Sequence, residues 1–188
     1  MNFHGGNILL IGYRGTGKSS VGKRLAGVLG MGFLDMDRLL VEEEGFTIAR
    51  IVQERGWPYF RQQEKHLLQR LSRNRGQVIA TGGGVVLDPE NRYLLKKMGL
   101  VIWLTADIDV MVERLKQDPA GVEQRPAFSE RDIREETGLI LKERIPLYEE
   151  VSDFSLDTSE MSIGETVDEI VGIIHKEMKK RRKNEQKR

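Results

Sequence analysis

Short apolar runs alternate with amphipathic stretches along most of the chain. The apolar runs hold few polar residues, as do strands that are covered on both faces of a sheet. Between them, apolar residues recur three or four positions apart, which is the spacing of a helix with one buried face. This alternation predicts an α/β fold with a parallel sheet between two layers of helices. The expected strands are Asn7–Ile11, Phe33–Asp35, Val78–Thr81, Val101–Leu104 and Phe154–Leu156.

Capping residues indicate where several helices begin and end. Thr47 can cap a helix that starts at Ile48, and Asp88-Pro89 can open another. Gly99 follows two lysines, which is typical of a helix C-terminus. The expected helices are Lys18–Leu29, Ile48–Glu54, Tyr59–Ser72, Asn91–Lys97, Val110–Lys116 and Ile163–Met178.

A polar segment from Gln117 to Ser129 interrupts the alternation. It contains two prolines and a glycine and fits neither a strand nor a helix. Loops of this length inside a compact domain are usually functional. We therefore expect a mobile lid at about 117–129 within one domain at 1–175, followed by a basic tail at 176–188.

The composition excludes several classes of protein. Hydrophobic residues make up 39% and charged residues 31% of the 188 residues, which is typical of a globular domain. The chain has no cysteine, so disulfides, thiolate metal sites and cysteine nucleophiles are excluded. The early apolar run Ile8–Ile11 is too short for a leader or a membrane span. We expect a monomeric cytoplasmic protein without a membrane partner.

The basic tail raises one alternative function. Eight Lys or Arg and two Glu lie between His175 and Arg188, while the formal net charge of the whole chain is only +1. Such a cluster is typical either of a solvated helix end or of a nucleic-acid contact in a non-enzymatic nucleotide sensor. The tail has no aromatic residue to stack on bases. We therefore expect no nucleic-acid partner.

The first apolar run is followed directly by the string G-Y-R-G-T-G-K-S at 12–19. This is the pattern G-x-x-x-x-G-K-[ST] in the context that it requires, between a strand and a helix. Its glycines let backbone N–H groups approach a phosphate, and the helix N-terminus favours the same anion. The string predicts a site for ATP and Mg²⁺ formed by Gly12, Arg14, Gly15, Thr16, Gly17, Lys18, Ser19 and Ser20.

Two acids, Asp35 and Asp37, close the second expected strand. Side chains two apart on a strand face the same way, and the carboxyl ends of parallel strands share one edge of the sheet. One acid can then orient Mg²⁺ while the other accepts a proton from a hydroxyl group. A helix cap and a solvated acid explain this short pattern equally well.

Three glycines, Gly82, Gly83 and Gly84, follow the third expected strand. They predict bare backbone that a small ligand can approach closely, although a flexible turn is the alternative. Arg61 and Glu64 are three apart on one expected helix, where the acid can hold the guanidinium to bind an anion. An ordinary surface ion pair is the alternative.

Two further arginines precede prolines. Arg125 lies in the expected lid, where it can close over phosphates. Arg144 lies just before Ile145-Pro146, and we expect its helix to break there and to hold the arginine at a cleft.

In this order, the strings resemble the shikimate kinase family. The matches are G-Y-R-G-T-G-K-S, F-L-D-M-D, F-R-Q-Q-E, I-A-T-G-G-G-V-V, Q-R-P and E-R-I-P-L-Y-E-E, within residues 12–150. The resemblance implies the three-layer P-loop fold of the nucleoside-monophosphate kinases, with five parallel strands in the order 2-3-1-4-5. It implies phosphate transfer from ATP to the 3-hydroxyl of shikimate, a step of aromatic amino-acid (chorismate) biosynthesis.

The resemblance also implies a role for each matching residue. Asp37 matches the acid that binds the shikimate hydroxyls and serves as the base, and Asp35 matches the acid near Mg²⁺. Arg61 and Arg144 match the pair that grips the substrate carboxylate. The other matches are Glu64, which steadies Arg61; Gly82, Gly83 and Gly84 beside the ring; and the phosphate clamps Lys18 and Arg125.

The expected lid departs from the family pattern. The family usually has R-P-L-L where this chain has Arg125-Pro126-Ala127-Phe128, and the segment is a few residues longer. The arginine on the adenine side is expected to be Arg114, with Lys116 as the alternative, and Trp57 has no clear counterpart. Another kinase of the same fold, acting on gluconate or a nucleoside monophosphate, is the alternative function.

Overall fold

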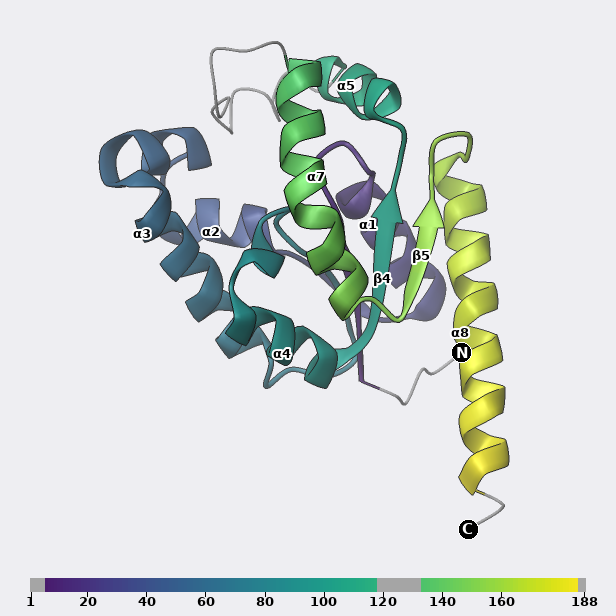
Figure 1. Ribbon diagram of the computed structural model, residues 1–188. Helices are drawn as coiled ribbons and strands as arrows, with labels where there is room; N and C mark the ends of the chain where they lie inside the picture. The colour runs from purple at the N-terminus through teal and green to yellow at the C-terminus, as the bar shows by residue number, and fades with distance from the viewer. Residues whose placement is uncertain (1–5, 118–132, 186–188) are drawn as a thin grey trace.

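The computed structural model describes residues 6–117 and 133–185. They form three layers, one sheet between two layers of helices (Figure 1). The elements alternate along the chain as the apolar pattern predicts. In chain order they are β1 (Asn7–Ile11), α1 (Lys18–Leu29), β2 (Gly32–Asp35), α2 (Met36–Glu44), α3 (Ile48–Leu71), β3 (Gln77–Ala80), the 3-10 helix η1 (Val85–Leu87), α4 (Pro89–Met98), β4 (Gly99–Thr105), α5 (Ile108–Lys116), α7 (Ile133–Val151), β5 (Phe154–Asp157) and α8 (Ile163–Glu185).

The sheet has the strand order β2-β3-β1-β4-β5, and every neighbouring pair is parallel. This confirms the expected order 2-3-1-4-5. The central strand β1 pairs Leu9 with Ile79 of β3 and with Val101 of β4. Because all strands run the same way, their carboxyl ends meet at one edge, where ligands bind in sheets of this kind.

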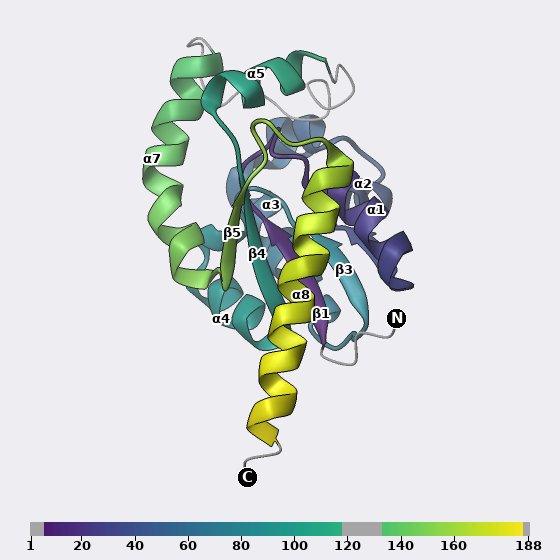
Figure 2. The ribbon, with the colours of Figure 1, turned by 90° about the vertical axis from the view of Figure 1, so that its right-hand side faces the viewer.

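Alternate residues of β1 face two different cores. Ile8 and Leu10 pack with apolar side chains of α1 and α8, whereas Leu9 and Ile11 pack with those of α3, α4 and α7. All four are fully buried, as the apolar run predicts. Figure 2 shows α8 lying across the first of these faces, beside α1. No helix in the described ranges 6–117 and 133–185 is both long and apolar enough to cross a membrane.

The helix expected to end at Met178 continues to Glu185 in α8, and two expected breaks in other helices also need correction. The helices expected at 48–54 and 59–72 form one element, α3, which bends at Gly56 where φ is 80° and ψ is 164°. The expected break before Pro146 is wrong, because α7 continues through it to Val151. Pro146 and Lys142, whose carbonyl the proline leaves without a helical partner, are both exposed. Water can therefore satisfy that carbonyl without a break in the helix.

Candidate active site

The glycine-rich string at 12–19 forms a loop between the end of β1 and the first turn of α1. Gly15 and Gly17 have φ values of 80° and 88°, which side-chained residues rarely adopt. The Tyr13 carbonyl accepts hydrogen bonds from the Thr16 hydroxyl at 2.8 Å and the Lys18 ammonium at 2.7 Å. No side chain caps α1, so its first backbone N–H groups can bind an anion.

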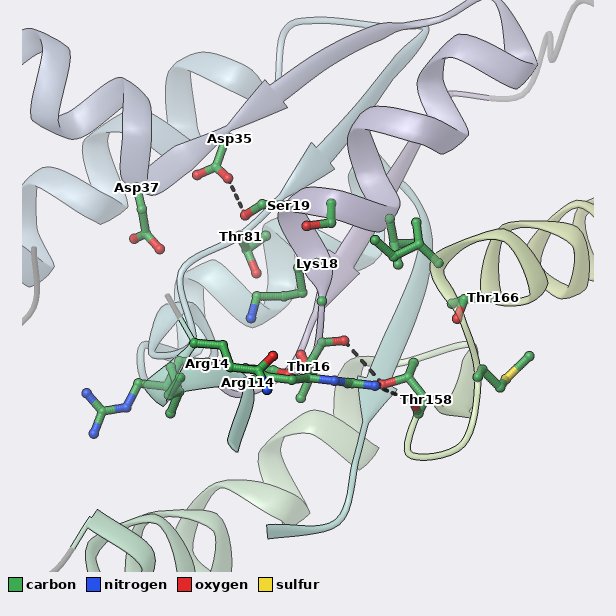
Figure 3. Close-up of a pocket in the computed structure, with 18 of the residues that line it drawn as sticks. Arg14, Thr16, Lys18, Ser19, Asp35, Asp37, Thr81, Arg114, Thr158 and Thr166 are labelled. Carbon is green, nitrogen blue, oxygen red and sulfur yellow. Dashed lines mark hydrogen bonds between the residues drawn. The ribbon is translucent and has the colours of Figure 1, made fainter. Parts of the chain in front are cut away.

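A cavity of about 730 Å³, here called the nucleotide cavity, lies over this loop (Figure 3). All of the loop residues predicted to bind ATP line it except Gly12, whose backbone lies against the Leu104 carbonyl where a Cβ would collide. The other lining residues include Asp35, Asp37, Thr81, Arg114, Thr158, Met161, Ile163 and Thr166. The loop and the segment between β5 and α8 therefore form its two ends.

Arg114 of α5 lies on the wall of the nucleotide cavity that is far from the sheet edge at Asp37 (Figure 3). Its guanidinium donates to the Thr158 carbonyl at 2.6 Å and to the Thr158 hydroxyl at 3.0 Å. These bonds fix a planar cation across the cavity from the acids. The alternative, Lys116, is exposed and lines neither cavity described here.

Ser19 and Asp35 place oxygen atoms side by side in the nucleotide cavity. One carboxylate oxygen of Asp35 accepts from the Ser19 hydroxyl at 2.5 Å, and the other caps α2 by accepting from the Arg38 N–H at 3.2 Å. Asp35 is thus a helix cap and a neighbour of the loop serine at once. A hydroxyl and a carboxylate are the hard oxygen donors that suit Mg²⁺, so these residues fit the metal that ATP carries.

Asp37 does not lie on the second strand as expected. Because Asp35 caps α2, the helix begins at Met36, and Asp37 stands in its first turn. The acid nevertheless reaches the edge of the sheet, where it lines the nucleotide cavity and also a smaller second cavity. Among the described residues, Arg14 is the other side chain that lines both. The two cavities therefore meet at Asp37 and Arg14.

The smaller cavity, here called the acceptor cavity, contains the predicted arginine–glutamate pair. Arg61 donates to Glu64 at 2.7 Å, and the Glu64 side chain is only 1% exposed. The pair thus lies at a cavity with its acid buried, and it is not the surface ion pair of the alternative interpretation. A Cβ on Gly82 would overlap Glu64 and come 2.9 Å from the Asp37 carboxylate, and one on Gly84 would overlap Arg61. At both positions the absence of a Cβ leaves the space that these side-chain ends occupy.

Two donors from α7 hold the middle glycine. The Gly83 carbonyl accepts hydrogen bonds from the Arg144 guanidinium at 3.1 Å and from the Tyr148 hydroxyl at 2.5 Å. Tyr148 is fully buried and stacks on Trp103, with ring centroids 5.6 Å apart. Arg144 is thereby fixed at the wall of the acceptor cavity although its helix does not break.

Opposite charges meet around the buried Glu64 carboxyl in the acceptor cavity. Burial raises the pKa of the Glu64 carboxyl above its usual range, while the guanidinium groups of Arg61 and Arg144 act in the opposite direction. The Arg61 guanidinium also lies 5.1 Å from the Trp57 ring centroid and 5.2 Å from that of Phe60. The cavity thus holds the guanidinium groups of Arg61 and Arg144 and bare backbone, with Asp37 and Arg14 at its boundary, which suits a small polar acid.

Comparisons with known proteins agree with this geometry. The sequence model described as shikimate kinase matches residues 14–175. A shikimate kinase of Syntrophus aciditrophicus (strain SB) is 47% identical over 173 residues, covering 88% of this chain and 89% of that protein. One of Pelotomaculum thermopropionicum is 42% identical over 165 residues, covering 88% and 93%. This chain belongs to the shikimate kinase family.

Solved structures extend the likeness to three dimensions. A shikimate kinase from Acinetobacter baumannii, solved in complex with shikimate, superposes with a TM-score of 0.87 at 32% identity. The match covers 93% of this chain and 95% of that one. A gluconokinase from Sinorhizobium meliloti matches with a TM-score of 0.54 at 20% identity, which shows only the shared fold.

The sequence patterns did not indicate several residues that line or support the two cavities of this shikimate kinase family member. Trp57 and Phe60 line the acceptor cavity with Tyr13, and their closeness in sequence to Arg61 is a signal that could have found them. Tyr148 and Thr158 contact residues more than 60 and 40 positions away, respectively, and no local pattern marks those contacts. Arg125 and the expected lid beyond Gln117 lie outside the described residues.

Proposed function

We propose that this chain is a shikimate kinase, which transfers the γ-phosphoryl group of ATP to the 3-hydroxyl of shikimate within aromatic amino-acid (chorismate) biosynthesis. The observation that carries the proposal is the boundary shared by two cavities. A phosphate-binding loop lies on one side, and an arginine-lined pocket with bare backbone lies on the other. Asp37 stands between them, where a hydroxyl would meet a phosphate.

The nucleotide side is proposed to hold the triphosphate. Lys18 and the N-terminus of α1 would bind the phosphate oxygens, and Ser19 and Asp35 would hold Mg²⁺ through oxygen atoms. When bound, Mg²⁺ neutralises part of the phosphate charge. Arg114 lies on the adenine side. Arg125, outside the described residues, keeps its predicted role as a phosphate clamp.

The acceptor side is proposed to hold shikimate by its two ends. Arg61 and Arg144 bind the carboxylate, because planar guanidinium groups form paired hydrogen bonds with it. Glu64 fixes Arg61, as their 2.7 Å contact supports. The backbone at Gly82, Gly83 and Gly84 lies beside the ring, where side chains would exclude it.

Asp37 is proposed to bind the 3-hydroxyl at the boundary of the cavities. It accepts the hydroxyl hydrogen, orients the oxygen towards the γ-phosphorus and takes the proton as the new bond forms. Phosphoryl transfer depends mainly on positioning and charge neutralisation, so a carboxylate of ordinary basicity is sufficient. The two adjoining cavities supply both the positioning and the charge neutralisation.

A panel of acceptors tests the proposal. The purified chain is assayed for ADP release, with ATP and Mg²⁺, on shikimate, gluconate and AMP in turn. We expect turnover with shikimate and little with the others, because the described lining of the acceptor cavity combines a pair of guanidinium groups suited to a carboxylate with Asp37, which suits a hydroxyl group. Turnover with gluconate or AMP but not shikimate would overturn the proposal. We also propose that the chain is a monomer and acts in the cytoplasm, where ATP is available.

A further inference from the structure

Arg14 occupies an unusual place for a residue of the phosphate-binding loop. Lys18 lines only the nucleotide cavity, whereas Arg14 lines both cavities. In Figure 3 the Arg14 side chain extends to the same side of Lys18 as Asp37, away from Thr158 and Thr166. The loop therefore carries one cation towards the triphosphate and a second towards the acceptor.

Contacts with Glu136 and Tyr13 hold Arg14 at this boundary. Its Nη2 lies 3.2 Å from Oε1 of Glu136 on α7, and its Nε donates to the Tyr13 hydroxyl at 3.2 Å. The side chains of Arg14 and Glu136 are only 12% and 4% exposed. A guanidinium held at two positions keeps a fixed orientation, which suits the recognition of a phosphate.

Glu136 stands behind Arg14 as seen from the ligand spaces. Glu136 lines neither the nucleotide cavity nor the acceptor cavity. A phosphoryl group at the boundary therefore meets the guanidinium of Arg14 and not the carboxylate behind it. Burying that carboxylate without its arginine would be costly, because it would leave an uncompensated charge.

The transferred group must cross this boundary. The bond between the γ-phosphorus and the bridging oxygen of ATP breaks, with its electrons leaving on ADP. The acceptor oxygen forms the new bond to phosphorus, and the hydroxyl proton goes to Asp37. The product phosphate, which carries negative charge, thus arrives at the boundary of the two cavities, where a nearby guanidinium can bind it. Arg14 is the loop cation on that side.

We propose that Arg14 is a catalytic residue that binds the phosphoryl group as it arrives on the acceptor, and that Glu136 is the positioning residue that orients Arg14. This inference rests on the proposed shikimate kinase function. It distinguishes two tasks in the loop, because Lys18 binds the phosphates before transfer and Arg14 binds the one that has moved.

The test compares the affinities for shikimate 3-phosphate and for shikimate by calorimetry on the full chain. In Arg14→Met the phosphorylated product should bind about 10-fold or more weakly, whereas shikimate should change by less than about 2-fold, since one charge-assisted hydrogen bond is lost from the product alone. The forward kcat should fall as well. Glu136→Gln should lose part of the same preference for the product.

A charge-neutral double variant separates this role from a structural one. Arg14→Met/Glu136→Gln removes both buried charges, so it folds even if Arg14→Met alone does not. The double variant should keep the weakened affinity for shikimate 3-phosphate. The matched control is Arg50→Met/Glu54→Gln, an exposed 2.7 Å pair on α3 that lines neither cavity, and it should retain the native preference.

Three results would overturn the inference. The first is equal weakening of both ligands in Arg14→Met, which would indicate general damage to the pocket. The second is recovery of the product preference in the double variant, which would mean that Arg14 serves only to neutralise Glu136. The third is an unchanged preference in Glu136→Gln, which would remove its positioning role. Failure of the native chain to phosphorylate shikimate would instead overturn the proposed function.

Discussion

The Arg61 guanidinium and the Glu64 carboxylate form a 2.7 Å ion pair on α3, and that carboxylate fills the space where a Cβ of Gly82 would lie. One acid thus connects an arginine of the acceptor cavity to the glycine backbone that lines the same cavity. This relationship explains why a carboxylate that could be solvated on a helix surface is buried instead. It also makes the acceptor cavity sensitive to small changes at either residue.

The buried state of Glu64 predicts a pH-dependent stability. Burial raises the pKa of its carboxyl above its usual range in the folded chain, although Arg61 and Arg144 oppose that shift. The protonated form therefore favours folding, and its contribution is complete below the unfolded pKa and lost as the pH rises through the folded pKa. Glu64→Gln has no such titration.

The expected result concerns the difference in Tm between the native chain and Glu64→Gln. As the pH rises from about 4 to about 8, this difference should shift against the native chain. Thermal unfolding followed by circular dichroism at several pH values measures it. A difference that shifts in favour of the native chain would mean that the two arginines outweigh the effect of burial.

Replacing the boundary acid should slow the reaction strongly. Asp37→Asn keeps the size of the side chain but loses the negative charge that accepts the hydroxyl proton, so kcat should fall about 100-fold. Steady-state ADP release with saturating shikimate measures the effect. Asp168→Asn, an exposed site on α8, is the control and should keep the native rate. A native kcat in Asp37→Asn would remove this acid from the mechanism.

Removing the α7 arginine should weaken acceptor binding. Arg144→Ala loses a charged hydrogen bond to the shikimate carboxylate, worth about 1.5–3 kcal/mol, so KM for shikimate should rise at least about 10-fold. Tyr148→Phe is the matched variant, because it keeps Arg144 and loses only the second donor to the Gly83 carbonyl. Its KM should rise less. If KM in Arg144→Ala stays native, the carboxylate binds elsewhere.

A single methyl group should damage the acceptor cavity. In Gly82→Ala the new Cβ would overlap Glu64 and crowd Asp37, so KM for shikimate should rise and kcat should fall. Gly27→Ala is the control, because nothing lies within 4 Å of its Cβ position on the exposed side of α1. That change should leave turnover intact and stabilise the helix by about 0.5–1 kcal/mol. Equal kinetics in the two variants would show that Gly82 does not need to be bare.

Local patterns predicted much of the fold and of the site. The bounds of β1 and α1 agree with the expected Asn7–Ile11 and Lys18–Leu29, because an apolar run and a glycine-rich turn leave little choice there. The prediction that the helix breaks at Pro146 is wrong, because Lys142 is exposed and water can bind the carbonyl that the proline leaves without a helical partner. Propensity rules cannot tell an exposed proline of a helix from a buried one.

The remaining part of the site depends on long-range contacts. Tyr148 donates to the Gly83 carbonyl, 65 positions away, and Arg14 pairs with Glu136, 122 positions away. Only the packing of α7 against the sheet edge brings these residues together. The sequence did indicate the spacing of Arg61 and Glu64, because one helix carries both and spacing along a helix determines contact.

The most direct test of the account is a crystal structure of the full chain with ADP, Mg²⁺ and shikimate. We predict that the shikimate carboxylate contacts Arg61 and Arg144, and that its 3-hydroxyl contacts Asp37 and faces the ADP phosphates. Shikimate bound on another surface, or with its 3-hydroxyl turned away from the phosphates, would contradict it.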